Sequence, residues 1–150
     1  MKIELEVLGR PAPKGSGRAI LVKGRAMHVP SGSNVNRDQL RSWDANVRAA
    51  AQSALGWGVE SPPFVETPLS VHIVFRLARP ASHWGKNGLK PKAPKYPITK
   101  PDKDKLTRAT CDSLKGIIYD DDSRICRSLV EKTYATPGTE GATITIEELV

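Results

Sequence analysis

The chain has few cysteines and no long apolar segment, and both features exclude classes of protein. Only two of its 150 residues are cysteine, Cys111 and Cys126, and their spacing matches no metal-binding motif. We therefore expect reduced thiols in a cytoplasmic protein, each acting as a small buried hydrophobic residue. No apolar run approaches the roughly 20 residues of a membrane span. The first residues alternate apolar and acidic side chains, so the sequence predicts no secretory signal either.

Aromatic residues are also scarce, at 5% of a chain that is 39% hydrophobic. This composition and length favour one modest core, and we predict a single domain over residues 1–150. Lysine and arginine number 23 against 16 acidic residues, which gives a net charge of +7. Such a balance favours a polyanionic partner, nucleic acid above all, although many basic proteins have no such partner.

Hydrophobic periodicity predicts a mixed α/β (α+β) fold with two main helices. Strict alternation over residues 69–77 is the strongest strand signal, and apolar residues recur every three or four positions over residues 36–55, as on one face of a helix. A second helix is expected from Asp102 or Asp104 to Lys115, entered through Pro101 and ended by Gly116. The remaining strands are predicted at 3–7, 125–135 and 143–148, with a hairpin formed by 19–22 and 26–29.

Residues from about 79 to 100 are rich in proline and lysine and separate the strong strand from the second helix. Trp84 and Tyr96 are interleaved with the lysines. We predict a long loop in which lysines contact phosphates and the aromatic rings stack on bases of a nucleic acid strand. A solvated, mobile loop is the alternative.

Aspartates flank the second predicted helix. Asp102 and Asp104 stand at its start, and Asp120, Asp121 and Asp122 follow its end. Carboxylates brought close together repel one another unless a cation neutralises them, and a hard divalent ion such as Mg²⁺ is the usual choice. A carboxylate metal site in a basic protein indicates chemistry on a polyanion.

The two acidic groups can share a metal only if the chain brings them together. Asp102 and Asp104 face the same side where the backbone is extended or just entering the helix. Residues 116–121, if extended, could travel the roughly 18 Å back along the helix to its start. The alternatives are that Asp102 and Asp104 cap the helix, that the triplet forms an exposed turn, and that Arg108 joins a surface ion-pair ladder with Asp104 and Asp112.

The segment from Lys100 to Ile125 resembles the signature of RusA-type Holliday junction resolvases. The resemblance lies in Lys100-Pro101-Asp102-Lys103-Asp104-Lys105-Leu106, then Asp112-Ser113-Leu114-Lys115-Gly116, then Asp121-Asp122-Ser123-Arg124-Ile125. It implies a homodimeric endonuclease, bacterial or phage-encoded, that uses Mg²⁺, or Mn²⁺ in its place, to nick four-way DNA junctions symmetrically. The implied fold is RusA-like, and no nucleotide cofactor is expected.

The resemblance also assigns roles to individual residues. It places the catalytic, metal-binding acids at Asp102, Asp104 and Asp122, with Asp121 as an accessory metal residue. The functional lysine of the family falls on Arg108, which could stabilise the charged transition state. Lys105 and Arg124 replace an Asn and a Gln of the family pattern, and both replacements add positive charge.

Basic residues outside the acidic cluster are expected to hold the DNA backbone. We predict phosphate contacts for Lys14, Arg18, Arg25, Lys86, Lys90, Lys92, Lys103 and Lys105. Two other functions compete with the nuclease: a non-catalytic nucleic-acid-binding protein whose acids are structural, and a basic interaction module for a protein partner. Neither alternative requires Asp-x-Asp and Asp-Asp at the two ends of one helix.

Overall fold

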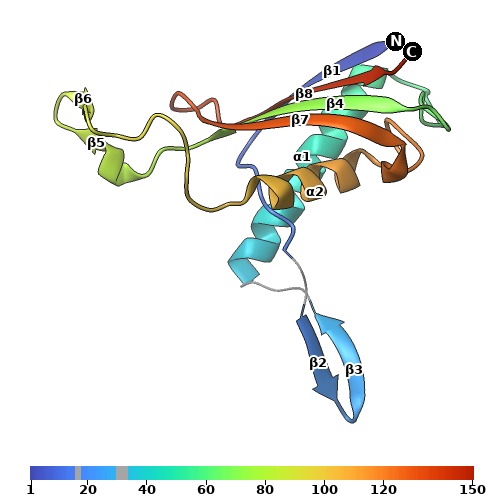
Figure 1. The fold of residues 1–150 in the computed structure, drawn as a ribbon, viewed down its shortest axis with the longest axis horizontal. Coiled ribbons are helices and arrows are strands. Elements are labelled where there is room, and N and C mark those ends of the chain that lie inside the picture. Colours follow the sequence, from blue (N-terminus) through green and yellow to red (C-terminus); the bar gives the residue numbers. More distant parts are fainter. Residues whose placement is uncertain (16–17, 30–33) are drawn as a thin grey trace.

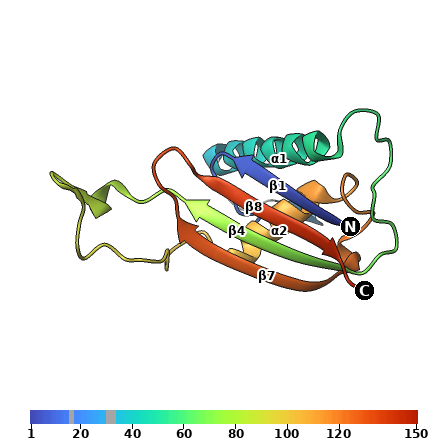
Figure 2. The same ribbon diagram turned by 90° about the horizontal axis from the view of Figure 1, so that it is seen from above.

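A four-stranded mixed sheet forms the centre of the computed structural model, which describes residues 1–15, 18–29 and 34–150. Its order is β1 (Lys2–Leu8), β8 (Gly141–Glu148), β4 (Leu69–Leu77) and β7 (Ile125–Tyr134). β8 pairs antiparallel with β1 and β4, whereas β7 pairs parallel with β4. The two termini lie side by side at one end of the sheet (Figure 1; Figure 2). The predicted α+β class is confirmed.

Helices α1 (Asn34–Leu55) and α2 (Lys103–Leu114) cover one face of this sheet (Figure 1). Every second residue of β4 is buried against them, as the alternation predicted. Trp43 of α1 is fully buried, and its indole N–H donates to Thr110 of α2 at 3.1 Å. The shared core therefore fixes both helices relative to the sheet, and α2 in particular.

The parallel pairing of β4 with β7 determines where α2 lies. Parallel neighbours cannot be joined by a tight turn, so the chain must cross over between them. Here the crossing consists of residues 78–102, α2, residues 115–121, and the short helix η2 (Asp122–Arg124) that leads into β7. α2 consequently runs across the covered face of the sheet (Figure 2).

Two hairpins project from this body (Figure 1). β2 (Arg18–Val22) and β3 (Arg25–Val29) form the predicted basic hairpin. The long loop is not structureless, because it contains the short helix η1 (Ala81–His83) and a small hairpin of β5 (Trp84–Gly85) and β6 (Gly88–Leu89).

The two cysteines occupy different environments. Cys111 is buried in α2, and burial raises the pKa of its thiol to about 11, so this thiol stays protonated at neutral pH. Cys126 is exposed on β7, so the expectation that both thiols are buried is wrong for this one. In the described part of the chain, no helix has the length and apolar character needed to cross a membrane.

Candidate active site

The first acidic group lies where the chain enters α2. Asp102 is the N-cap residue and has an extended backbone, but its side chain makes no capping hydrogen bond. Its carboxylate lies 3.6 Å from the Lys105 ammonium and is largely exposed. Asp104 is exposed in the first turn, where the helix dipole favours a negative charge. The backbone at Asp102 is extended, as a shared metal site with Asp104 requires. The Asp102 side chain does not cap the helix, as the alternative interpretation had it.

The aspartate triplet divides into three different environments. Asp120 binds the Arg124 guanidinium at 2.7 and 3.0 Å, and this contact lowers its pKa. Asp121 accepts from the backbone N–H of Ser123 at 2.8 Å and lies 3.3 Å from the Lys115 ammonium. The Ser123 hydrogen bonds, followed by Lys115, lower the pKa of Asp121 to about 2. Both carboxylates are therefore engaged in local structure.

Asp122 differs from its two neighbours because its carboxyl makes no ion pair in the described part of the chain, and the charge of Lys115 offsets its raised pKa only in part. Its Oδ1 atom is buried and has no hydrogen-bond partner among the described residues. Burial raises the pKa of Asp122, and contact with the Asp112 carboxyl raises it further. Two carboxyls in contact, one of them with a buried oxygen that lacks a partner, are costly in free energy, and such pairs cluster at functional sites.

Asp112, in the last turn of α2, was assigned no site role by the sequence. It was expected to extend the surface ladder through Arg108, but Arg108 makes no ion pair with Asp104 or Asp112 in the described part of the chain. Instead Asp112 accepts from the Lys14 ammonium at 2.7 Å while it faces Asp122. The backbone N–H of Lys14 donates to Lys105 at 3.1 Å, which holds the segment after β1 against α2.

The two acidic groups lie at opposite ends of α2. Asp104 and Asp112 are eight residues apart, which corresponds to about 12 Å along a helix axis. The chain does not travel back after α2, because Gly116 donates to Tyr119 at 2.8 Å and closes a turn there. The buried Tyr119 hydroxyl also donates to the Cys111 carbonyl at 2.8 Å. The chain does not take the return path toward Asp102 that the sequence allowed: over residues 1–15, 18–29 and 34–150, no three Asp, Glu, His or Cys side chains gather as metal ligands.

The surroundings of Asp122 nevertheless fit a hard divalent cation. Such an ion would give the buried Oδ1 a partner and would offset the repulsion between the Asp112 and Asp122 carboxyls. The donor set is all oxygen, as Mg²⁺ and Mn²⁺ prefer. Neither end of α2 brings three such side chains together within the described part of the chain.

Two of the predicted DNA-binding residues are already paired with acidic side chains. Lys14 is paired with Asp112 and Lys105 with Asp102, so neither ammonium is free of a neighbouring acid. Arg124 is neutralised by Asp120, which removes the extra positive charge that its replacement of the family Gln was expected to add. The other predicted residues whose side chains are described are exposed: Arg25, Lys86, Lys90, Lys92 and Lys103. The side chain of Arg18 lies outside the described part of the structure.

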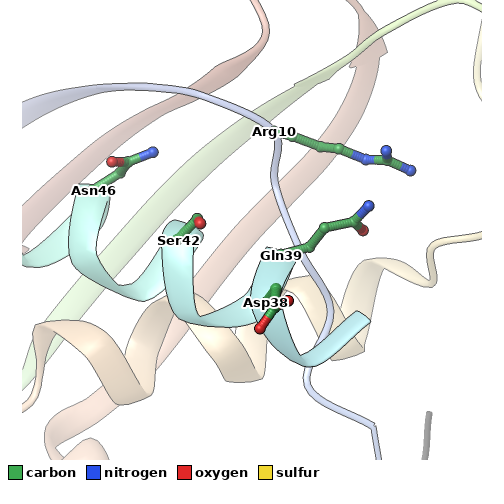
Figure 3. A pocket seen from close by; sticks show the side chains of 5 residues that line it. All are labelled: Arg10, Asp38, Gln39, Ser42 and Asn46. Carbon is green, nitrogen blue, oxygen red and sulfur yellow. The ribbon is translucent and has the colours of Figure 1, made fainter. Parts of the chain in front are cut away.

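An open hollow of about 270 Å³ lies elsewhere, along the outer side of α1. Arg10 and Gln39 extend into the same space, and Asp38, Ser42 and Asn46 also line it (Figure 3). None of the acids around α2 lines this hollow. The side chains of Asp102 and Asp104 are exposed, so an extended substrate that lies across the protein can reach them.

The sequence was compared with protein families and with curated proteins. The family described as Endodeoxyribonuclease RusA matches residues 11–147, a range that includes α2, both acidic groups and the long loop. The search of curated proteins gives no match. Since the family match covers nearly the whole chain, and since the acids flank α2 as the family signature requires, the chain belongs to the RusA family of metal-dependent endodeoxyribonucleases, which resolve Holliday junctions.

Proposed function

We propose that this protein uses Mg²⁺ to resolve four-way DNA junctions by paired nicks, and that Mn²⁺ can substitute. The observation that carries the proposal is the buried, unpartnered Oδ1 of Asp122 beside the Asp112 carboxyl. In a basic nuclease, a buried carboxyl oxygen that lacks a partner and lies beside a second carboxyl is best explained by a cation that arrives with the phosphodiester. Family membership favours this function over both a non-catalytic DNA-binding protein and a module for a protein partner.

The proposed ligands are Asp102, Asp104 and Asp122, with Asp121 in support. A bound divalent ion would supply an activated water and would stabilise charge on the leaving oxygen. The exposed carboxylates of Asp102 and Asp104 can approach a DNA backbone only when a cation offsets their charge. Arg108 lies one turn beyond Asp104 on the same helix face, where its guanidinium can donate to a phosphate oxygen.

We further propose a homodimer in which each active site takes acids from both chains. The support is the separation along α2, because Asp104 and the Asp112–Asp122 pair are too far apart to hold one ion within a chain. In a two-fold dimer, the start of α2 in one chain would face Asp122 of the other, and two equivalent sites would result. Two such sites match the two-fold symmetry of a four-way junction.

Branched DNA would be held by shape and by phosphate contacts. The support is the position of Lys86, Lys90 and Lys92, which are exposed on the projecting loop together with the partly exposed Trp84 and the exposed Tyr96. Arg25 is exposed at the turn of the β2–β3 hairpin, so a second projection can reach another DNA arm (Figure 1). We propose that the protein acts in the cytoplasm of a bacterium, on host or phage DNA.

The direct test is cleavage of a synthetic four-way junction in the presence of Mg²⁺. Wild type should cut two opposite strands, whereas Asp122→Asn and Asp104→Asn should each lose about 10²-fold or more in rate. Asp38→Asn is the matched control, since Asp38 lies on the exposed side of α1 away from these acids. If both active-site variants cut at the wild-type rate while binding the junction normally, the residue assignment is wrong.

A further inference from the structure

Lys132 occupies an unusual position on the edge strand β7. It pairs with the buried Phe75 of β4 and shares a strand face with the partly buried Val130. That face is the one covered by the helices, where an apolar side chain is the usual choice. A lysine there requires a specific partner for its ammonium group.

The partners are two carbonyls at the entrance to α2. The Lys132 ammonium donates to the Thr99 carbonyl at 3.0 Å and to the Pro101 carbonyl at 3.0 Å. Pro101 directly precedes Asp102, whose own carbonyl accepts the first helical hydrogen bond of α2 from Leu106. One side chain of the sheet thus holds the backbone immediately before the first acidic group.

A second contact from β7 restrains the other end of the long loop. The Arg79 guanidinium lies 4.2 Å from the centre of the Tyr134 ring and donates to the Pro94 carbonyl at 2.7 Å. The centres of the His83 and Tyr134 rings lie 5.5 Å apart, and the two rings are nearly perpendicular. These contacts hold the base of the loop on β7 without Lys132. The two hydrogen bonds of Lys132 therefore act only on residues 99–101.

We propose that Lys132 is a positioning residue, which holds Asp102 and Asp104 where they can bind the divalent cation. Asp102 makes no capping hydrogen bond that would fix its side chain, so its placement depends on the backbone before it. Lysine suits this task because its compact ammonium carries three donors and can bind two carbonyls at once. The inference rests on the proposed function, since it assumes that Asp102 and Asp104 are ligands.

Hydrogen exchange tests the structural half of the proposal without metal or DNA. In Lys132→Met, the amides of residues 106–108, the first hydrogen-bonded turn of α2, should exchange about tenfold faster, as expected when a hydrogen bond from a charged donor is lost. Lys132→Arg keeps the donors and should stay within about threefold of wild type. Lys2→Met is the control, because Lys2 is a strand lysine whose partner is the exposed Glu4 at 3.3 Å. Unchanged exchange in Lys132→Met would overturn the proposal.

The Mg²⁺ dependence of junction cleavage tests the functional half. Lys132→Met should need about 10- to 100-fold more Mg²⁺ for half-maximal cleavage, the usual effect of losing a group that supports metal ligands. Its junction affinity in Ca²⁺ should stay near wild type, and Lys132→Arg should restore the Mg²⁺ dependence. An unchanged Mg²⁺ requirement in a folded Lys132→Met refutes the positioning role. A wild-type protein that never cuts a junction refutes the proposed function instead, so the two failures are distinguishable.

Discussion

The separation of the acidic groups along α2 predicts how two inactive variants behave when they are combined. Asp104 lies in the first turn of α2, and Asp122 contacts Asp112 in the last. The eight residues from Asp104 to Asp112 span about 12 Å of helix. Oxygen ligands lie about 2.0–2.6 Å from a divalent ion, so two ligands of one ion are at most about 5 Å apart. If one ion takes ligands from both ends of α2, as we propose, those ligands must come from two chains.

The perturbation is a mixture of Asp104→Asn chains with Asp122→Asn chains, refolded together so that dimers form at random. Neither homodimer contains an intact site. In a mixed dimer, one site carries both substitutions, while the other receives wild-type acids from both chains. Half of the dimers are mixed and each has one intact site of two, so about one quarter of the wild-type sites should survive.

A plasmid that extrudes a cruciform provides the assay. Wild type should linearise it by paired nicks, whereas the mixture should yield nicked circles at about one quarter of the initial nicking rate. A mixture of Asp102→Asn with Asp104→Asn is the control, since both residues lie at the same end of α2 and every mixed dimer stays inactive. If the first mixture shows no more nicking than this control, the acids of one site belong to one chain and the reasoning fails.

Three further predictions concern stability. Asp122→Asn should raise the melting temperature at neutral pH, by about 2–4 °C for each kcal/mol. The reason is that the pKa of Asp122 is raised, so its carboxylate form destabilises the fold as the pH rises through that pKa. The gain in melting temperature should therefore vanish in acid, and a variant that melts below wild type at neutral pH would contradict the assignment. Asp121→Asn should instead destabilise the fold at neutral pH, because a pKa lowered to about 2 means that the carboxylate form of Asp121 stabilises the folded state. The loss in the free energy of unfolding, measured with urea, should shrink as the pH falls toward 2. Trp43→Phe should cost about 1 kcal/mol for the lost bond to Thr110, and combining it with Thr110→Val should cost less than the sum of the two.

The secondary structure could be predicted closely because its signals are local. The alternation over residues 69–77 matches β4, and the three-to-four-residue spacing of apolar side chains matches α1. The entry of α2 after Pro101 and its end near Gly116 follow from backbone preferences of proline and glycine. The small β5–β6 hairpin was missed, since two-residue strands carry no periodicity.

The contacts of single polar residues were harder to predict. Lys132 lies on the same face of β7 as Val130 and Tyr134. A lysine among apolar and aromatic residues at two-residue spacing is the signal that could have indicated a buried partner for its ammonium group. Asp112 was assigned to an ion-pair ladder because helix spacing alone allows it. Its actual neighbours, Lys14 and Asp122, lie far along the chain or beyond a turn, where spacing gives no information.

The sequence by itself determined the class of the fold, the position of both acidic groups at the ends of one helix, and the resemblance that implied a junction-cutting nuclease. These depend on local periodicity, on backbone preferences and on a linear motif. Only the tertiary structure decided that Asp122 stays at the far end of α2 with Asp112, because the turn at residues 116–119 and the buried Tyr119 hold it there. A rigid helix keeps its ends apart, and packing against the sheet determines what each end meets.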